Sequence, residues 1–258
     1  MKIHILGSLS GTEPMPNRNH TSWALELDNG NIYLFDAGEN CSRTAYISQM
    51  DMLQIKAVFI SHPHYDHVGG LLNVFSTMQK MRALSKDKEQ RNVDIFMPTM
   101  ELWETFDAFT KAVGCYPPCT EINEQILSDG GFFKNDDIMV EFRGNEHVAK
   151  AENGDFRAFS FRITAEDKVV VYSGDVRSPD EFADWSLNCN ALLMESGHHH
   201  PWEVCAKWKE NNCNIGKVIF MHHGRDYLNL PTQTAVAARK AWGGDVTFAE
   251  DNMLIEVK

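Results

Sequence analysis

Three histidines and one aspartate lie within six consecutive residues of this chain, in the segment 61–70. Neutral imidazole and carboxylate groups are ligands that zinc and other divalent first-row metals take in proteins. Side chains two positions apart in an extended segment point the same way, so His62 and His64 can reach one ion. Asp66 and His67 can then face a second ion. The spacing predicts a metal site, against the alternative of polar residues in an ordinary surface loop.

An apolar run, residues 57–60, comes directly before this segment. A short apolar run with β-branched residues is typical of a buried strand. Loops at the ends of such strands often carry catalytic groups, because the scaffold beneath them is rigid. The sequence therefore predicts that the histidine-rich segment projects from the end of a buried strand.

Other candidate ligands also follow segments that have the pattern of strands. They are His147 after strand 138–142, Asp175 after strand 169–172, and His222 after strand 217–221. Each alone has an ordinary alternative, since a histidine can be a satisfied core residue and an aspartate can cap a helix. His223 competes with His222, which we prefer because it ends its strand immediately. Asp36 could equally lie beside a metal centre or stabilise a turn.

Strands and helices alternate along the chain, and each polar candidate comes near the carboxyl end of a strand. We expect further strands at 2–6, 23–27, 32–35, 93–97, 156–163 and 191–194, and a last strand or hairpin over 246–258. We expect helices at 41–52, 71–84, 99–113, 201–213 and 231–241, a loop at 114–123, and a charged connection at 85–92. The sequence contains no proline- or serine-rich linker and no repeat. We therefore expect one domain over residues 1–258.

The composition indicates a globular, acidic protein. Apolar residues make up 43% of the 258 residues, and 24 basic against 36 acidic residues give a net charge of −12. An acidic surface disfavours general binding to nucleic acid, although metal ions dominate the field near their own site. Six dispersed cysteines without a C-x-x-C pair, no signal peptide and no long apolar run predict a reduced cytoplasmic protein that does not enter the membrane.

The motif H-x-H-x-D-H-x-x-G, from His62 to Gly70, resembles the signature of the metallo-β-lactamase superfamily of binuclear metal hydrolases. The resemblance implies an α/β fold, the four-layer αββα sandwich. It implies that one ion is bound by His62, His64 and His147, the other by Asp66, His67 and His222, with Asp175 bridging them. Zinc is the expected metal, and manganese or iron suits the same ligands. The oxygen-reducing diiron branch tends to have glutamate in place of His64, so hydrolysis is favoured.

Two divalent ions can lower the pKa of a shared water and supply a bridging hydroxide near neutral pH. In the resembled superfamily an aspartate ligand, here Asp66, can orient that water or accept its proton. The leaving group then needs an acid. The segment 195–200 offers Glu195 with His199 or His200, because a carboxylate that holds an imidazole makes it a competent proton donor. The alternative is an exposed turn that happens to contain three histidines.

Residues 11–22, 34–39 and 172–177 are similar to motifs of the ribonuclease Z and phosphodiesterase branch. Ribonuclease Z typically inserts a long basic arm that grips tRNA in the interval that corresponds to 148–174. Such an arm does not fit in this interval, and Tyr65 replaces the usual glycine. We therefore expect a phosphodiesterase that acts on a small phosphoester. Arginines that could contact its phosphate, or be ordinary surface residues, are Arg18, Arg177 and Arg225.

Several alternatives stay open at this point. The chain could be a tRNA 3′-end-processing endonuclease, or a hydrolase of carbon esters, lactams or thioesters with the same metal centre. A third alternative is a non-catalytic metal-binding sensor that retains the fold. By analogy with the resembled branch, a homodimer is possible.

Overall fold

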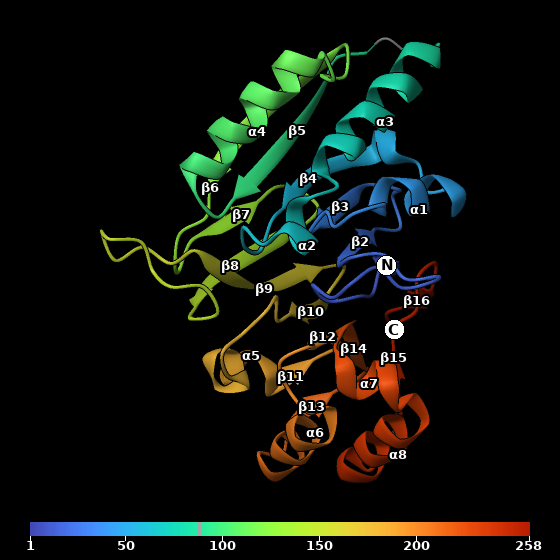
Figure 1. Cartoon of the computed structure of the whole chain (residues 1–258), viewed down its shortest axis with the longest axis vertical. Helices are drawn as coiled ribbons and strands as arrows, with labels where there is room; N and C mark the ends of the chain where they lie inside the picture. Colours follow the sequence, from blue (N-terminus) through green and yellow to red (C-terminus); the bar gives the residue numbers. More distant parts are fainter. Residues whose placement is uncertain (87–88) are drawn as a thin grey trace.

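The computed structural model describes residues 1–86 and 89–258, and its elements form four layers. Two seven-stranded sheets lie face to face, with helices on the outer face of each sheet (Figure 1). This is the αββα sandwich expected from the sequence. Asp87 and Lys88, in the segment expected to be a charged connection, lie outside the described residues. Within the described part of the chain, no helix has the length and apolar character needed to span a bilayer.

The first sheet contains strands from the amino-terminal half and one strand from the end of the chain. Its order is β16 (Leu254–Glu256), β1 (Lys2–Gly7), β2 (Ser22–Glu26), β3 (Ile32–Phe35), β4 (Ile55–Phe59), β5 (Arg91–Met97) and β6 (Thr120–Ile126). The pairs from β16 to β3 are antiparallel, and the pairs from β3 to β6 are parallel.

The second sheet has the same arrangement of antiparallel and parallel pairs. Its order is β15 (Val246–Phe248), β14 (Val218–His223), β12 (Ala191–Ser196), β10 (Lys168–Tyr172), β9 (Ala158–Ala165), β8 (Met139–Asn145) and β7 (Phe132–Lys134). The pairs from β7 to β10 are antiparallel, and those from β10 to β15 are parallel. A separate two-stranded sheet pairs β11 (Asn188–Cys189) with β13 (Asn214–Ile215).

Aromatic rings fill the space between the two sheets. In the first sheet a row of stacked rings crosses strands β2 to β5, with centroid separations of 4.4 Å for Trp23 and Phe35, 5.0 Å for Phe35 and Phe59, and 4.7 Å for Phe59 and Phe96. Phe161 of the second sheet packs edge-on against Phe35 and Phe59. Buried aromatic pairs of this kind add about 0.5–1.5 kcal/mol each beyond their buried area. Strand β4 is thus held firmly where the histidine-rich loop begins.

Helices cover the outer faces of both sheets. The first sheet is covered by α1 (Cys41–Ile47), α3 (Leu71–Leu84) and α4 (Met100–Val113), and the second by α5 (Ala183–Ser186), α6 (Pro201–Glu210) and α8 (Pro231–Trp242). Helix α3 buries Leu71, Val74, Phe75 and Met78, the spacing of one helical face. Helix α4 begins where Thr99 accepts a hydrogen bond from the Leu102 amide, at 3.2 Å, and ends at Gly114 in a left-handed conformation.

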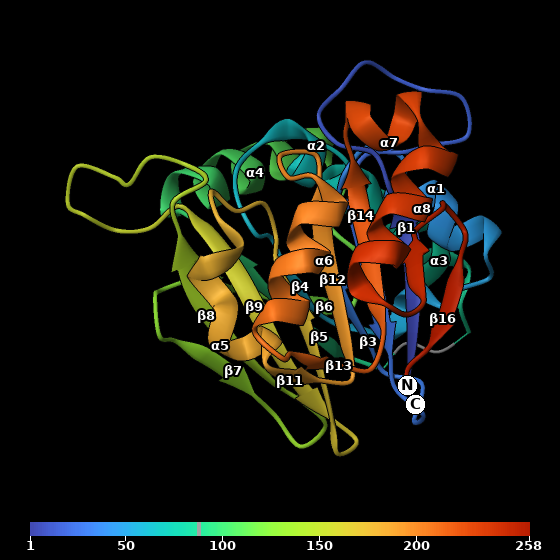
Figure 2. The same ribbon diagram turned by 90° about the horizontal axis from the view of Figure 1, so that it is seen from below.

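The directions of the strands bring the polar segments to one edge of the sandwich. In each sheet the parallel strands end at the same edge, and β8 runs in the direction of β10 because both are antiparallel to β9. The short helices α2 (Tyr65–Val68) and α7 (Arg225–Asn229) lie at this edge, while both chain termini lie at the opposite one (Figure 2). Ligands commonly bind at the carboxyl ends of parallel strands.

Three expectations about elements are wrong. The sequence predicts a loop over 114–123, but strand β6 begins at Thr120. Strand β6 is an exposed edge strand, so its sequence lacks the apolar alternation of a half-buried strand. Helix α1 ends at Ile47 and a 3-10 turn, Met52–Gln54, follows it. The segment 246–258 is not a single strand or hairpin, because β15 and β16 join different sheets.

Candidate metal centre

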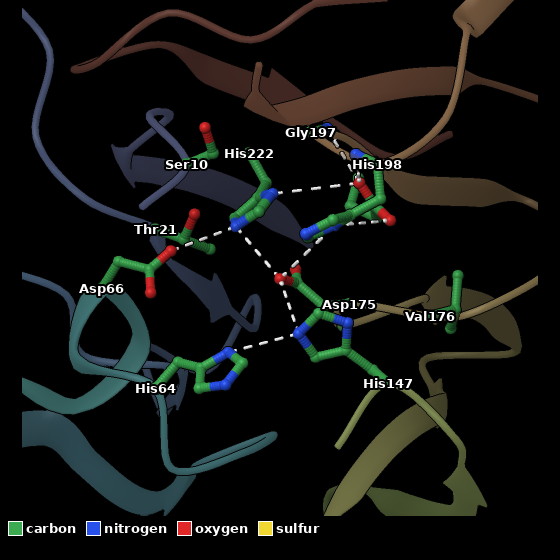
Figure 3. A network of polar contacts seen from close by, with 12 residues as sticks. Ser10, Thr21, His64, Asp66, His147, Asp175, Val176, Gly197, His198 and His222 are labelled. Atoms are coloured by element: carbon green, nitrogen blue, oxygen red, sulfur yellow. Dashed lines mark hydrogen bonds and ion pairs between the residues drawn. The ribbon is translucent and has the colours of Figure 1, made fainter. Parts of the chain in front are cut away.

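Seven side chains that were candidates from the sequence meet at the edge where α2 and α7 lie. His62, His64, Asp66 and His67 come from the loop after β4 and from α2, whereas His147, Asp175 and His222 come from the ends of β8, β10 and β14. Figure 3 shows most of them converging on one small space. The loop after β4 approaches the loop after β3 closely, because Gly70 has no side chain: a Cβ there would stand 2.2 Å from the Gly38 carbonyl oxygen.

One set of potential ligand atoms consists of three imidazole nitrogens. The Nδ1 atom of His64 lies 3.0 Å from Nε2 of His62 and 3.2 Å from Nε2 of His147. Ligands at the zinc–nitrogen distance of about 2.0–2.1 Å in a tetrahedral site stand roughly 3.3 Å apart. The three nitrogens therefore have the spacing of ligands around one ion.

A second set combines a carboxylate and two imidazoles. The Nε2 atom of His222 lies 3.1 Å from Oδ2 of Asp66, and Nε2 of His67 lies 3.5 Å from the same oxygen. His67 and Asp66 come from one turn of helix, while His222 reaches them from the second sheet. This spacing, too, matches that of ligands around a single ion.

Asp175 lies between the two sets. Its Oδ2 atom is 3.5 Å from Nε2 of His147 and 3.2 Å from Nε2 of His222, and its Oδ1 atom is 3.5 Å from Nε2 of His67. Two of these atoms, Oδ1 of Asp175 and Nε2 of His67, are buried without a hydrogen-bond partner in the described structure. Buried polar atoms are normally satisfied, so orphaned ones that face the same space fit a bound cation.

The pKa shifts of five of the seven groups suit metal ligands. Burial lowers the pKa of His62, His64 and His147, so these imidazoles keep a free lone pair near neutral pH. Burial opposes ionisation of Asp66, but hydrogen bonds from His222 and His67 outweigh it and hold the pKa of the carboxyl below its usual range. Burial likewise opposes ionisation of Asp175, and the neighbouring charges of His222 and His67 keep its pKa low. For His67, burial lowers the pKa, but the carboxylates of Asp175 and Asp36 outweigh it and raise the pKa, so an ion bound there would displace a proton from this imidazole.

Hydrogen bonds behind the ligands fix which nitrogens face the site. The Nδ1 atom of His67 lies 2.8 Å from Oδ2 of Asp36, and Nδ1 of His62 lies 3.0 Å from the Ser61 hydroxyl. Assigning a proton to each Nδ1 leaves both Nε2 lone pairs directed at the site. Asp36 is completely buried and also accepts hydrogen bonds from the Ser61 amide, the Ser61 hydroxyl and Tyr172. Asp36 was considered either as a residue beside a metal centre or as one that stabilises a turn, and these contacts support the first role.

Replacing Asp36 with asparagine is expected to weaken metal binding by roughly 10–100-fold, as for other hydrogen-bond partners of metal ligands. The variant keeps the shape of the side chain but loses the charge that holds the His67 ring. Competition with a chromophoric chelator measures the change. Asp137→Asn is a matched control, since that carboxylate binds Asn29 and Asn31. Wild-type affinity in a folded Asp36→Asn protein would contradict the assigned role.

The two adjacent histidines at the end of β14 point in different directions. His222 has φ of 51°, a left-handed conformation that turns its ring toward Asp66 and Asp175. His223 is buried on the other side, where Nε2 donates to the Ala249 carbonyl at 2.8 Å and Nδ1 accepts from the Ser196 hydroxyl at 2.9 Å. Burial lowers the pKa of His223 to about 3, which is typical of a neutral core histidine. The structure therefore brings His222, and not His223, into the cluster of candidate ligands.

Glu195 and the three histidines that follow it are arranged differently from our expectation. Oε2 of Glu195 accepts hydrogen bonds from the amides of Gly197 and His198, at 2.8 and 2.9 Å, and this turn returns the His198 ring toward the site. Nδ1 of His198 lies 3.2 Å from Oε1 of Glu195 and 3.8 Å from Oδ2 of Asp175. The hydrogen bond that Nδ1 of His198 donates to Glu195 raises the pKa of His198 to about 9.

The two histidines that we selected as proton donors lie farther from the cluster. Nε2 of His199 donates to the Val176 carbonyl at 2.9 Å and lies 3.4 Å from Glu195. His200 binds Asp226 and stacks on Trp202, with ring centroids 4.7 Å apart. The placement therefore favours His198 over His199 and His200. The sequence did contain a signal for this arrangement, because Glu195 and His198 are three residues apart with Gly197 between them, a spacing that allows a tight turn.

A cavity of about 490 Å³ opens onto the ligands. Its wall includes Ser10, Thr12, Tyr65, His198 and Arg225 beside Asp66, Asp175 and His222. Of the three arginines considered for phosphate contact, only Arg225 lines this cavity, and it forms a two-pronged ion pair with Glu13. Arg177 pairs with Glu146, and Arg18 binds Ser8 and Glu250. Another cavity, of about 550 Å³ beside Arg18 and Arg43, contains none of the candidate ligands.

The paired sheets and the histidine and aspartate cluster at their common edge define the class of this protein, a hydrolase of the metallo-β-lactamase superfamily close to the ribonuclease Z and phosphodiesterase branch. A sequence model of the family described as Anti-Pycsar protein Apyc1 matches residues 1–210, and the chain belongs to that family.

Similarity to proteins of known sequence and structure supports this assignment. The chain is 25% identical over 312 aligned residues to ribonuclease Z of Archaeoglobus fulgidus, with 99% of the chain and 97% of the relative covered. Among solved structures, human tRNase Z, short form, has a TM-score of 0.73 at 17% identity and complete coverage of both chains. Zn²⁺-bound PqqB from Methylobacterium extorquens has a TM-score of 0.71 at 13% identity, with coverage of 99% and 100%. The ligand set and these relatives together indicate that the protein uses divalent metal.

Proposed function

We propose that the protein is a binuclear metal-dependent phosphodiesterase that hydrolyses a small phosphodiester. The observation that carries this proposal is Asp175, whose two oxygens contact both sets of ligand atoms, within 3.5 Å of His147, His67 and His222. His62, His64 and His147 would hold one ion, and Asp66, His67 and His222 the other, with Asp175 between them. Zinc suits these nitrogen and oxygen ligands best.

When bound, a pair of divalent ions supplies a hydroxide near neutral pH and polarises the phosphoryl oxygens. The residues of the chain orient the substrate and move protons around that centre. The Asp66 carboxylate is ionised and faces the cavity, so it can accept a hydrogen bond from the attacking water and orient it. His198 stands on the same cavity, held by Glu195, and donates a proton to the departing alkoxide.

Replacing His198 with glutamine is expected to lower kcat by roughly 10²–10⁴-fold for a diester with an alkoxide leaving group. The loss for bis-p-nitrophenyl phosphate is expected to be much smaller, because p-nitrophenolate departs without a proton. Steady-state kinetics with a dinucleotide and with the aryl ester measure the two effects. His200→Gln is the matched control, because His200 binds Asp226 outside the cluster. Equal losses for both substrates would contradict the role of His198 as the acid.

A small substrate is favoured by the segment between His147 and Asp175. The loop 148–157 leads from His147 into β9, which pairs directly with β10, so this interval has no room for a long inserted arm. The net charge of −12 also opposes attraction of a polyanion. A tRNA endonuclease is the second candidate, because curated relatives such as the Archaeoglobus fulgidus protein are ribonucleases Z.

A substrate panel tests the proposal. Metal-replete protein should hydrolyse bis-p-nitrophenyl phosphate, and linear or cyclic nucleoside phosphodiesters are further candidates for turnover. Nitrocefin and a thioester report the alternative carbon-centred hydrolysis, and precursor tRNA reports the endonuclease. Rapid cleavage of precursor tRNA at its 3′ end, with slow turnover of every small diester, would overturn the small-substrate proposal.

The family description assigns an anti-Pycsar role to the protein Apyc1. We propose the same role for this chain, exerted through the hydrolytic site. In cells that carry a Pycsar system, the wild-type protein should then counter it, and the Asp66→Ala variant, produced at the same level, should not. If the Asp66→Ala variant countered the Pycsar system as well as the wild type does, the anti-Pycsar role would not depend on hydrolysis.

A further inference from the structure

Tyr65 lies on the wall of the cavity that opens onto the candidate metal ligands. It directly precedes Asp66, which is buried, yet 64% of Tyr65 is exposed to solvent. The residue lines the same cavity as Asp66, Asp175 and His222. Isolated aromatic residues on a protein surface need no explanation, but one that borders the reaction site does.

The ring of Tyr65 is held in a defined place. It lies against Gly69, where a Cβ would stand 2.6 Å from Cε2 and 2.8 Å from Cζ of the ring. Gly69 has φ of −62° and ψ of −20°, an ordinary helical conformation that does not itself require glycine. The buried ring of His20 meets Tyr65 edge to face, with centroids 6.2 Å apart. Contacts with Gly69 at the end of its own helix and with His20 therefore hold the aromatic side chain in place.

The polar end of Tyr65 plays no part in the fold. Within residues 1–86 and 89–258, its hydroxyl has no hydrogen-bond partner. Burial of the ring does not explain its position either, because most of it remains in water. What Tyr65 offers at this place is an exposed aromatic ring beside Asp66 on the wall of the cavity.

We infer that Tyr65 stacks on a planar aromatic group of the substrate, which for a biological phosphodiester is a nucleobase. This inference rests on the proposed phosphodiesterase function. The phosphoryl group would lie at the metal centre on the floor of the cavity, and the Tyr65 ring would hold the base at the wall. Stacking of a base on an aromatic side chain contributes about 1–3 kcal/mol and depends little on which base is present. Tyr65 would thus select nucleoside diesters over alkyl diesters without reading the base.

Two substrates with the same leaving group test this inference. Thymidine 5′-(p-nitrophenyl phosphate) and methyl p-nitrophenyl phosphate both release p-nitrophenolate, and they differ in whether a nucleoside or a methyl group remains on the phosphate. The ratio of their kcat/KM values is measured for wild type, Tyr65→Phe, Tyr65→Leu and Tyr65→Ala. Metal content and inhibition by inorganic phosphate report whether the metal site itself is intact in each protein.

Tyr65→Ala and Tyr65→Leu are expected to lower this ratio about 5- to 150-fold, whereas Tyr65→Phe should keep the wild-type ratio because it keeps the ring. An equal fall for both substrates in Ala and Leu but not Phe, with phosphate inhibition retained, would instead assign the ring to the aryl leaving group. An unchanged ratio and unchanged rates in Tyr65→Ala, or the same loss in Tyr65→Phe, would overturn the inference.

Failure of the proposed function would look different. In that case metal-replete wild type would hydrolyse neither substrate. Calorimetric titration with thymidine 5′-monophosphate and with deoxyribose 5-phosphate would then decide the role of Tyr65. Tighter binding of the nucleotide that is lost in Tyr65→Ala and kept in Tyr65→Phe supports stacking, and equal binding of the two ligands by wild type contradicts it.

Discussion

Asp66→Ala is expected to lower kcat for a phosphodiester by roughly 10²–10⁴-fold, the range for loss of a positioned acid–base group. The carboxylate lies 3.1 Å from Nε2 of His222 and 3.5 Å from Nε2 of His67, and its low pKa keeps it ionised. Alanine removes both the proposed metal ligand and the proposed acceptor that orients the attacking water. Steady-state kinetics with bis-p-nitrophenyl phosphate measure the loss.

Metal analysis of the Asp66→Ala protein must accompany these rates, since a protein that retains its metal isolates the orienting role. Asp180→Ala provides a control for a general effect of removing an aspartate, because Asp180 is exposed and pairs with Lys207. Turnover within threefold of wild type in Asp66→Ala would remove Asp66 from the mechanism.

The second large effect is expected for Asp175→Ala, which should bind at most one ion tightly. Asp175 is 2% exposed, and its carboxylate is the group that both sets of ligand atoms share. Without it each ion loses an anionic ligand, and the two ions lose the negative charge between them. The loss in affinity should exceed the roughly 10–100-fold that follows from changing a partner outside the ligand sphere.

Elemental analysis after equilibration with a metal buffer measures this stoichiometry. Asp175→Asn, which keeps the volume and one oxygen, should bind metal better than the alanine variant. Circular dichroism separates loss of ligand from loss of fold. A folded Asp175→Ala protein that still binds two ions per chain with wild-type affinity would rule out a bridging carboxylate.

Much of the candidate site could be predicted because its signals are local. His62, His64, Asp66 and His67 are close in sequence, and the apolar run before them identifies the supporting strand. His147, Asp175 and His222 were recognisable because each follows a strand and the strand ends meet at one edge of the sandwich. The paired sheets followed from the alternation of elements and from the resembled superfamily.

Other features depend on tertiary contacts that leave little trace in the sequence. Strand β6 has a polar sequence, and its pairing with β5 determines its conformation. The separation of β15 and β16 into different sheets depends on the partners β14 and β1. The choice among His198, His199 and His200 depends on two amide hydrogen bonds to Glu195, which turn His198 toward the site, and on the contacts of His199 with Val176 and of His200 with Asp226.

The central claim is that two ions share this site, and the metal content of the wild-type protein tests it most directly. Purified chain is stripped with a chelator, reloaded with Zn²⁺ in separate titrations with and without competing chelator, and analysed for bound metal per chain. The seven candidate ligands, with Asp175 shared between the two sets, predict two ions per chain at saturation, with activity that returns as the second ion binds. Saturation at one ion or fewer per chain, in protein with full phosphodiesterase activity, would contradict the account.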